Sequence, residues 1–304
     1  MVFRILSLDG GGAKGIYTLG VIEEIERTMK TPCYKLFDLI YGTSTGAIIA
    51  CLLSLGKPAA EIRDMYLNEI PNALGKGKAS DRSKALRQLA QQTIKMSTFD
   101  DMLTLTGIVT TDCTNNRPKI FKSNKSQAFS RQESFEPGFG ASLIEAVLAS
   151  CAAVPYFLPV DVKTINQGCP TLIDGGFVAN NPVLFAITDA IGAIRIEQSQ
   201  MRVLSIGTGW FAKPSQSAVE WVKSKVIERS SLRFIEHSLA ASSRSTDFLA
   251  RNLFKDVVLE RLDGEFTNHK CGLLTTDRTL LLAAHTCGRD TFGQHESSIV
   301  RLLS

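Results

Sequence analysis

The sequence of 304 residues combines 44% hydrophobic residues with 21% charged ones, and its 34 lysines and arginines exceed its 30 aspartates and glutamates by only four. This balance excludes an intrinsically disordered chain, which has few apolar residues and a high net charge, and it excludes a collagen-like one. The small positive charge also argues against a protein that binds nucleic acid polymers. We therefore expect a globular protein in which any preference for anions is local.

Cysteine usage and the length of the apolar stretches bear on the cellular setting. The seven cysteines include no CxxC pair, which is typical of reduced thiols in a cytoplasmic protein and argues against a zinc site. The apolar N-terminal run is interrupted by Arg4 and closed by Asp9, so it is too short and too charged for a signal peptide. Residues 47–55, the longest strongly apolar stretch, are about half of what a membrane span needs. We expect a soluble protein that meets membranes from outside.

The first part of the chain alternates apolar runs with amphipathic ones. Residues 3–8 are apolar and meet a glycine-rich turn, which predicts a buried parallel strand. Apolar residues at spacings of three and four then predict a helix that ends before Pro32. A second apolar run, residues 36–41, meets Gly42 and turns directly into the apolar residues 47–55. This pattern predicts a strand, a sharp turn and a buried helix.

The later elements continue this alternation. A predicted amphipathic helix at 62–70 precedes the lysine-rich segment 73–95, which shows no strong period. The remaining predictions are strands at 108–111, 119–122, 171–173 and 201–206, helices at 142–153 and from Pro182, mostly helical sequence at 219–254, and an edge strand at 257–262. Alternating strands and helices predict an α/β fold with three α/β/α layers and a mostly parallel central sheet. Because no linker divides the chain, we expect one domain over 1–304, with its motifs in 3–209 and a helical C-terminal part in 210–304.

A glycine-rich string, Asp9-Gly10-Gly11-Gly12-Ala13-Lys14-Gly15, joins the first strand to the first helix. Gly10, Gly11 and Gly12 lack Cβ atoms, so their N–H groups can face one point at a helix N-terminus, a site suited to an oxyanion. The string also matches GxGxxG through Gly10, Gly12 and Gly15, which favours a dinucleotide-binding oxidoreductase. Against that alternative, Asp9 places a carboxylate beside the pyrophosphate, and the second strand ends without an acid for a ribose. This motif alone leaves both interpretations open.

The second turn, Gly42-Thr43-Ser44-Thr45-Gly46, is a GxSxG sequence between the second strand and the apolar helix. In such an elbow the glycines two before and two after the serine let the two backbones approach, and the serine adopts a strained conformation that exposes its Oγ. No other such sequence competes with it. We therefore take Ser44 as the candidate nucleophile, with Gly42 and Gly46 as its support, against the alternative of a tight turn with an idle serine.

A nucleophilic serine needs a base. The chain has four histidines, all in its last quarter and away from any glycine turn, so a Ser-His-Asp triad is only an alternative: His237, His269, His285 and His295. Asp174 instead follows the predicted strand 171–173 and precedes Gly175 and Gly176, and a carboxylate at the carboxyl end of a strand points into the crevice where parallel sheets place their sites. Aspartate, with a reference pKa of about 3.9, acts as a base only when burial raises that pKa. The sequence thus predicts a buried site with apolar walls.

The three turns, in this order, resemble those of the patatin-like phospholipase family, in which a DGGG-x-[RK]-G loop, a GxSxG serine and a DG[GA] aspartate form an oxyanion hole and a Ser-Asp dyad. The resemblance assigns the oxyanion hole to Gly10, Gly11 and Gly12, the basic position to Lys14, the nucleophile to Ser44, and the base to Asp174 with support from Gly175 and Gly176. Lesser similarities are Ala149-Ser150-Cys151-Ala152-Ala153 with Pro155, Asn180-Asn181-Pro182, and Ser205-Ile206-Gly207-Thr208-Gly209. Lysine at position 14 keeps the charge of the arginine found in many members but loses its planar fork.

The resemblance implies hydrolysis of the fatty acyl esters of membrane phospholipids. Ser44 Oγ would attack the ester carbonyl while Asp174 takes its proton, the loop amides would hold the oxyanion, and a water activated by Asp174 would release the fatty acid. This chemistry needs no metal and no cofactor. The alternatives from other classes are the dinucleotide-binding enzyme and a catalytically idle module that senses a ligand.

Compact bacterial proteins of this kind also resemble the phospholipase effectors of cyclic-oligonucleotide (CBASS-type) anti-phage signalling. That resemblance implies a cyclic di- or trinucleotide activator and peripheral action on the inner membrane face from the cytoplasm. Two basic stretches are candidate phosphate contacts, although most charge runs are solvated surface: Lys76, Lys78, Arg82, Lys84 and Arg87, then Arg117, Lys119, Lys122, Lys125 and Arg131. The sequence leaves the oligomeric state open, a homo-oligomer included.

Overall fold

The computed structural model describes residues 2–129, 132–165, 168–210, 231–266 and 271–304. Its strands form one eight-stranded sheet in the order β5-β6-β3-β2-β1-β7-β8, with β4 on β3: β1 Phe3–Leu8, β2 Leu39–Thr43, β3 Leu105–Asp112, β4 Arg117–Lys122, β5 Val160–Asp161, β6 Thr171–Asp174, β7 Met201–Ile206 and β8 Val258–Leu262. The pairs that join β3, β2, β1, β7 and β8 are parallel, whereas β4, β5 and β6 pair antiparallel. The predicted mostly parallel sheet is confirmed.

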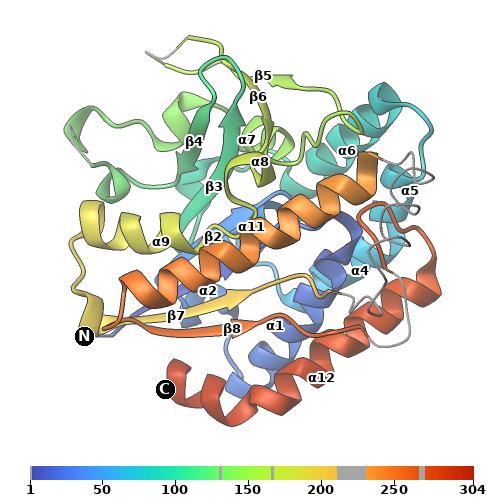
Figure 1. The fold of residues 1–304 in the computed structure, drawn as a ribbon. Helices are drawn as coiled ribbons and strands as arrows, with labels where there is room; N and C mark the ends of the chain where they lie inside the picture. The colour runs from blue at the N-terminus through green and yellow to red at the C-terminus, as the bar shows by residue number, and fades with distance from the viewer. Residues whose placement is uncertain (1, 130–131, 166–167, 211–230, 267–270) are drawn as a thin grey trace, which may run out of the picture.

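Helices cover both faces of this sheet. They are α1 Gly15–Met29, α2 Cys33–Leu36, α3 Thr45–Ser54, α4 Ala59–Asn68, α5 Ile70–Leu74, α6 Ala79–Ile94, α7 Leu143–Ser150, α8 Gly176–Ala179, α9 Val183–Asp189, α11 Ser231–Leu253 and α12 Arg278–Leu303. In Figure 1, α9 and α11 cross the front of the sheet, and both chain ends lie at the lower left. Among the described helices, none is long and apolar enough to cross a membrane.

The alternation of side chains along the strands divides the apolar core into two halves. Ile5, Tyr41 and Val203 point to the face covered by α8, α9 and α11, and they belong to one buried cluster. Their neighbours Leu6 and Leu204 point to the other face and pack with α1, α3 and α12. Successive strand residues therefore bury both faces, as expected for strands in the middle layer of three. The predicted α/β/α architecture is confirmed.

The first long helix and the last one pack unusually close to each other. A Cβ on Gly20 of α1 would lie 2.2 Å from the carbonyl oxygen of His285, and a Cβ on Gly288 of α12 would lie 2.1 Å from that of Tyr17. Glycines at these two positions let the backbones of α1 and α12 approach. The end of α12 also reaches β1, because Arg4 donates to the carbonyl of Ser304 at 3.0 Å. The C-terminal part thus packs on the N-terminal part within the same body.

Several predicted elements differ from the observed ones. The strand predicted at 36–41 is β2, which begins only at Leu39 because the preceding residues form α2. The helix predicted at 62–70 is divided into α4 and α5, with Pro71 in the first turn of α5, a position that proline favours. Segment 73–95 contains α6, whose buried face is narrow. The helical prediction at 219–254 is confirmed for α11, and its beginning lies outside the described residues.

The strand predicted at 171–173 is β6, which pairs antiparallel with β3, and this direction explains how the site forms. One edge of β3 pairs with β4 over residues 107–112. The other edge therefore pairs with β2 over 105–109 and then with antiparallel β6 over 110–112. Because β2 and β6 follow each other along the same edge, their carboxyl ends meet head to head, with Thr43 opposite Val109 and Asp174 opposite the next residue. Gly175 permits this approach, since a Cβ there would lie 2.2 Å from the Val109 carbonyl oxygen.

Candidate active site

Ser44 occupies the turn between β2 and α3 in a backbone conformation that side chains rarely adopt, with φ 53° and ψ −121°. The two flanking glycines are required by close contacts. A Cβ on Gly42 would lie 2.2 Å from the carbonyl oxygen of Gly46, and one on Gly46 would lie 2.2 Å from that of Leu8. The predicted elbow is therefore present, and it projects Ser44 from the end of the parallel strands.

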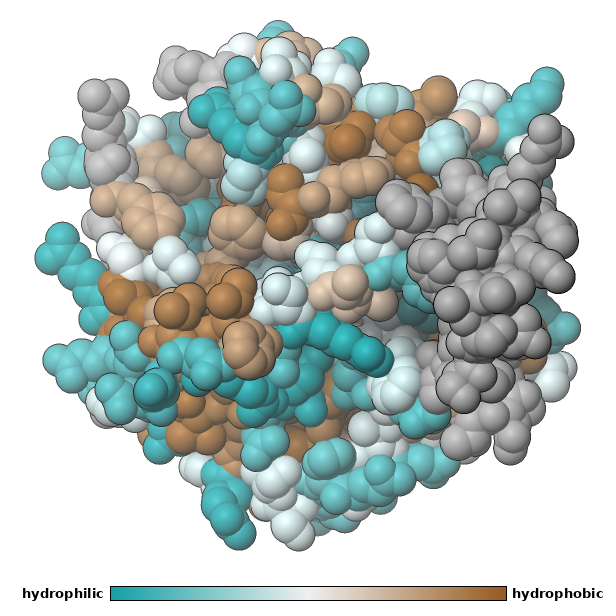
Figure 2. Space-filling view, viewed as in Figure 1, coloured by the Kyte–Doolittle hydropathy of each residue, from teal (hydrophilic) through white to brown (hydrophobic). Residues whose placement is uncertain are grey.

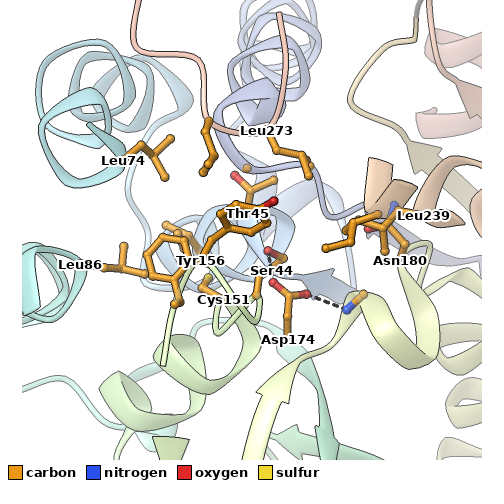
Figure 3. Close-up of a pocket in the computed structure, with 18 of the residues that line it drawn as sticks. Ser44, Thr45, Leu74, Leu86, Cys151, Tyr156, Asp174, Asn180, Leu239 and Leu273 are labelled. Atoms are coloured by element: carbon orange, nitrogen blue, oxygen red, sulfur yellow. Dashed lines mark hydrogen bonds between the residues drawn. The ribbon is translucent and has the colours of Figure 1, made fainter. Parts of the chain in front are cut away.

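Asp174 is in hydrogen-bonding contact with the serine. Ser44 Oγ donates to Asp174 Oδ2 at 2.7 Å, and the N–H of Gly176 donates to Oδ1 at 2.7 Å. The aspartate is only 5% exposed, and this burial raises its pKa to about 6, although the two hydrogen bonds lower it in part. A carboxylate with that pKa is ionised at neutral pH and is a stronger base than an exposed aspartate. Figure 3 shows the two side chains side by side at the centre of the cavity.

The end of α7 and the residues just after it hold both members of this pair. The hydroxyl of Ser150 accepts the N–H of Ser44 at 2.9 Å and donates to the carbonyl of Val109 at 2.6 Å. The carbonyl of Ala152 accepts the N–H of Asp174 at 3.0 Å. The similarity at 149–153 therefore marks a support for the serine and the aspartate, a role that the sequence pattern did not reveal.

The three glycine amides predicted for the oxyanion hole are not equivalent. The N–H of Gly10 donates to the carbonyl of Asn180 at 3.0 Å, so this amide is engaged and does not face the serine as predicted. Gly10 is instead needed for space, because a Cβ would lie 2.6 Å from Asn180 Oδ1. Gly11 and Gly12 line the cavity that holds Ser44, and their N–H groups make no hydrogen bond to any described residue. These two amides are the available donors.

Residues of the C-terminal part hold the glycine-rich loop from behind. Arg261 of β8 makes a bidentate contact with the Asp9 carboxylate, in which each terminal guanidinium nitrogen donates to one carboxylate oxygen at 2.7 Å. The guanidinium also donates to Ser205 Oγ at 2.8 Å. Burial alone would lower the pKa of Arg261, but the Asp9 carboxylate raises it overall, so the guanidinium stays charged. Asp9, which argued against a bound pyrophosphate, is thus an anchor for the loop.

A second C-terminal contact covers the same loop. The carbonyl of Leu273 accepts the N–H of Ala13 at 2.9 Å, and the N–H of Leu273 donates to Glu236 of α11 at 2.9 Å. Ser243 of α11 accepts a hydrogen bond from the Asn180 side chain at 2.9 Å. None of these C-terminal residues was among the predicted site residues.

Lys14 and the histidines that the structure describes do not line the cavity around the serine. Lys14 Nζ is 3.4 Å from the carbonyl oxygen of Gly209 and does not line the cavity. His285 contacts Glu23 at 3.0 Å, and burial lowers its pKa. Of the described histidines, which exclude His269, none lines the cavity, so the triad alternative finds no base beside Ser44 within the described part of the chain.

The walls of the cavity around Ser44 and Asp174 are largely apolar. In Figure 3, Leu74 and Leu86 approach from one side and Leu239 from the other. Two of its polar side chains are paired with each other, since the hydroxyls of Thr45 and Tyr66 are in hydrogen-bonding contact. The predicted buried site with apolar walls is confirmed. The described residues contain no cluster of three or more metal-ligating side chains.

The two basic stretches differ in exposure and in the contacts of their side chains. Lys76, Lys78, Lys84 and Arg87 are exposed around α6, whose inner face lines the cavity. In the second stretch Lys122 is buried and paired with Asp189. Arg117 lies 3.6 Å from the Asp112 carboxylate, and Lys119 lies over the ring of Phe139. Lys125 is exposed. Arg131 lies outside the described residues. The second stretch is therefore not a continuous phosphate-binding row.

A strained serine beside a buried aspartate, at the carboxyl end of a mostly parallel sheet between helices, is the arrangement of a patatin-like hydrolase. The model of that family, described as "Patatin-like phospholipase", matches residues 6–187, more than half of the chain, and the chain belongs to this family. It is a patatin-like phospholipase by family and fold.

Particular relatives carry more specific names. The chain is 39% identical over 304 residues to the cUMP-AMP-activated phospholipase of Escherichia coli, an alignment that covers 99% of this chain and 94% of that protein. It is 30% identical over 238 residues to the cGAMP-activated phospholipase of Vibrio cholerae, covering 67% of this chain and 64% of that protein. Among solved structures, VipD from Legionella pneumophila superimposes with a TM-score of 0.48 at 13% identity, covering 97% of this chain and 67% of that one.

Proposed function

We propose that this chain hydrolyses the fatty acyl esters of membrane phospholipids through a Ser44-Asp174 dyad and an acyl-enzyme. The observation that carries the proposal is the 2.7 Å contact between Ser44 Oγ and the buried Asp174 carboxylate, in a cavity that is also lined by Gly11 and Gly12. Nucleophile, base and oxyanion donors are the three parts that ester hydrolysis by a serine requires.

The geometry supports a reaction in two halves. Asp174 takes the Ser44 proton as Oγ attacks the ester carbonyl carbon, and the amides of Gly11 and Gly12 hold the negative charge on the carbonyl oxygen. The lysophospholipid alkoxide leaves with the proton from Asp174, and the acyl group stays on Ser44. Asp174 then takes a proton from water, whose oxygen attacks the acyl carbon, and Ser44 regains a proton as the fatty acid departs.

We also propose that a cyclic dinucleotide switches this activity on, in an anti-phage role. The support is the E. coli relative named as cUMP-AMP-activated, which aligns with 99% of this chain, the C-terminal part included. The V. cholerae relative is named for a different nucleotide, cGAMP, so the names leave the particular nucleotide open. A cyclic trinucleotide is the alternative that the experiment must include.

The surface suggests where such an enzyme would work. We expect peripheral action on the inner membrane face, with the exposed cations Lys76, Lys78, Lys84 and Arg87 near the cavity wall available for anionic headgroups.

Figure 2 shows apolar surface near α9 and the end of α11, where Phe248, Leu249 and Leu253 are exposed. Such a surface is a candidate for self-association, and sedimentation velocity with and without the nucleotide measures it.

The experiment is mass spectrometry of phospholipid vesicles incubated with the protein alone, with cUMP-AMP, with cGAMP and with a cyclic trinucleotide. We expect fatty acid and lysophospholipid to appear with one of these nucleotides, and the Ser44→Ala variant to release neither. Equal release by Ser44→Ala would overturn the dyad, while release that no nucleotide alters would overturn the activation. No release in any condition favours the ligand-sensing module, and a retained nicotinamide or flavin favours the oxidoreductase.

A further inference from the structure

The cavity around Ser44 reaches the surface beside two exposed apolar side chains. Phe177 of α8 lines the cavity and is 48% exposed, so it marks a place where the cavity meets solvent. Leu158, also 48% exposed, directly follows Phe157, another lining residue, and its N–H donates to Ser83 Oγ of α6 at 2.9 Å. Figure 2 shows apolar surface where α6, α8 and the beginning of α11 approach one another. Phe177 and Leu158 thus form an apolar rim at the opening of the cavity.

Cations lie along the same opening. Arg82 Nε donates to the carbonyl of Leu74, a lining residue, at 3.0 Å, and the next residue along α6 contacts Leu158 of the apolar rim. Residues 75–88, which surround this contact, contain one acid, Asp81, against five cations: Lys76, Lys78, Arg82, Lys84 and Arg87. The surface beside the apolar rim is therefore positively charged.

An anionic lipid bilayer is the partner that fits this combination. Apolar side chains are stabilised when they enter the region of the acyl chains, and neighbouring lysines and arginines meet the phosphates of the headgroups. The apolar rim is also continuous with the cavity, so a lipid held there reaches Ser44 without its acyl chains crossing water. The exposed Phe248 and Leu253 lack this continuity, because they lie at the other end of α11 from the lining residue Leu239.

We propose that this edge of the molecule docks on the bilayer, with the apolar rim of Leu158 and Phe177 inserted among the lipids and Lys76, Lys78 and Lys84 at the anionic headgroups. This inference rests on the proposed function, since it takes membrane phospholipid as the substrate. It adds an orientation, in which the carboxyl ends of the parallel strands face the membrane and their amino ends face away from it. The docked surface thus favours bilayer lipid over a dissolved ester without supplying a reacting group.

Vesicle binding by the Ser44→Ala chain tests this surface, because a chain without the nucleophile leaves the lipids intact. Flotation with vesicles of phosphatidylethanolamine and phosphatidylglycerol measures it, with each nucleotide above present and absent. We expect Leu158→Ser to weaken binding about tenfold, because a leucine side chain is withdrawn from the apolar layer. Leu103→Ser is the matched control and leaves binding unchanged. Leu103 is 57% exposed, but its N–H donates to the Ser54 carbonyl at 2.7 Å, at the other end of α3 from position 44.

Two charge reversals on α6 test the contact with the headgroups. Lys84→Glu, one residue after the contact with the apolar rim, should weaken binding to these vesicles about tenfold or more, and the loss should shrink as salt is added. Lys95→Glu is its control, because Lys95 is also exposed but caps the other end of α6. It should change binding less than about twofold, since about 16 Å of helix separates it from Lys84, more than the screening length in physiological salt.

Hydrolysis of p-nitrophenyl acetate, a dissolved ester, is measured with the same four substitutions in the chain that keeps Ser44. We expect the wild-type rate from each; where one variant loses this rate, the other pair decides. Equal vesicle binding within both pairs would overturn the docking surface, as would a Ser44→Ala chain that binds no vesicle with any nucleotide, since the apolar rim would then fit a partner protein. A wild-type chain that hydrolyses neither the dissolved ester nor the vesicle lipids would instead overturn the proposed function, so the two failures are distinguishable.

Discussion

The motif-bearing part and the C-terminal part of the chain contribute to the same site in different ways. The first supplies the groups that would react, Ser44 and Asp174, and the glycines that let strands and turns approach. The second supplies no reacting group among its described residues. It supplies contacts to the glycine-rich loop through Arg261 and Leu273, and a wall of the cavity through Leu239.

The reacting groups and the contacts that support them are therefore separable in this fold. The reacting groups come from short turns at the carboxyl ends of strands, where a few residues fix the geometry. The support comes from distant side chains that meet these turns only after folding. Variants of the first kind should change reactivity and can even raise stability, whereas variants of the second kind should lower stability.

The largest expected loss of stability comes from Arg261→Ala. It leaves the buried Asp9 carboxylate without its partner, which typically costs about 3–5 kcal/mol of unfolding free energy. Lys57→Ala is the control, because Lys57 pairs with Glu61, whose side chain is 55% exposed, so the loss of this surface pair costs about 1 kcal/mol or less. Urea denaturation measures both. Equal losses in the two variants would show that the Asp9 contact is no special anchor.

Asp174→Asn should raise the free energy of unfolding at neutral pH, whereas Arg261→Ala lowers it. The folded-state pKa of Asp174 is about 6 and its unfolded value is about 3.9, so the folded state holds a proton that the unfolded state has lost between these values. Wild-type stability therefore falls as the pH rises from about 4 to about 6. We expect Asp174→Asn to be about 3 kcal/mol more stable than the wild type at pH 7.5 and about equally stable near pH 4. A variant less stable at pH 7.5 contradicts the burial of this charge.

The smallest expected effect concerns the contact of α12 with α1. Gly288→Ala places a Cβ against the Tyr17 carbonyl, and overpacking of this kind costs about 1–3 kcal/mol. Gly293→Ala, five residues later on the same helix, meets no atom within 4 Å and should raise stability by about 0.5–1 kcal/mol because alanine favours the helix. Thermal unfolding of both variants measures the difference. Shifts of the same sign would contradict the close approach of the two helices.

The glycine turns allowed much of the site to be predicted from the sequence. Tight turns have local requirements, so the Ser44 elbow and the proximity of Asp174 followed from a few residues each. The antiparallel direction of β6 did not, because it depends on which edge of β3 remains free after β2 ends. The hydrogen bond of the Gly10 amide could not be predicted either, because it depends on Asn180 from a distant turn.

The C-terminal support could not be predicted for the same reason. Arg261 and Asp9 are 252 positions apart in the sequence, and a charged residue in an edge strand carries no local sign of its partner. Segment 73–95 lacked a strong period because α6 buries only a narrow face, so its helix was not predicted either. Contacts of this kind are visible only when the distant segments are assembled.

The most direct test of the dyad uses an ethyl fluorophosphonate, which labels a reactive serine covalently, and measures how the rate constant for labelling Ser44 depends on pH. If Asp174 is the base, the rate constant rises with pH through about 6, where the carboxylate loses its proton, and then reaches a plateau. In Asp174→Asn the same reaction should be slower by about 10³-fold or more and should lose the step at that pH. A variant that is labelled as fast as the wild type, with the step still present, would show that another group activates Ser44.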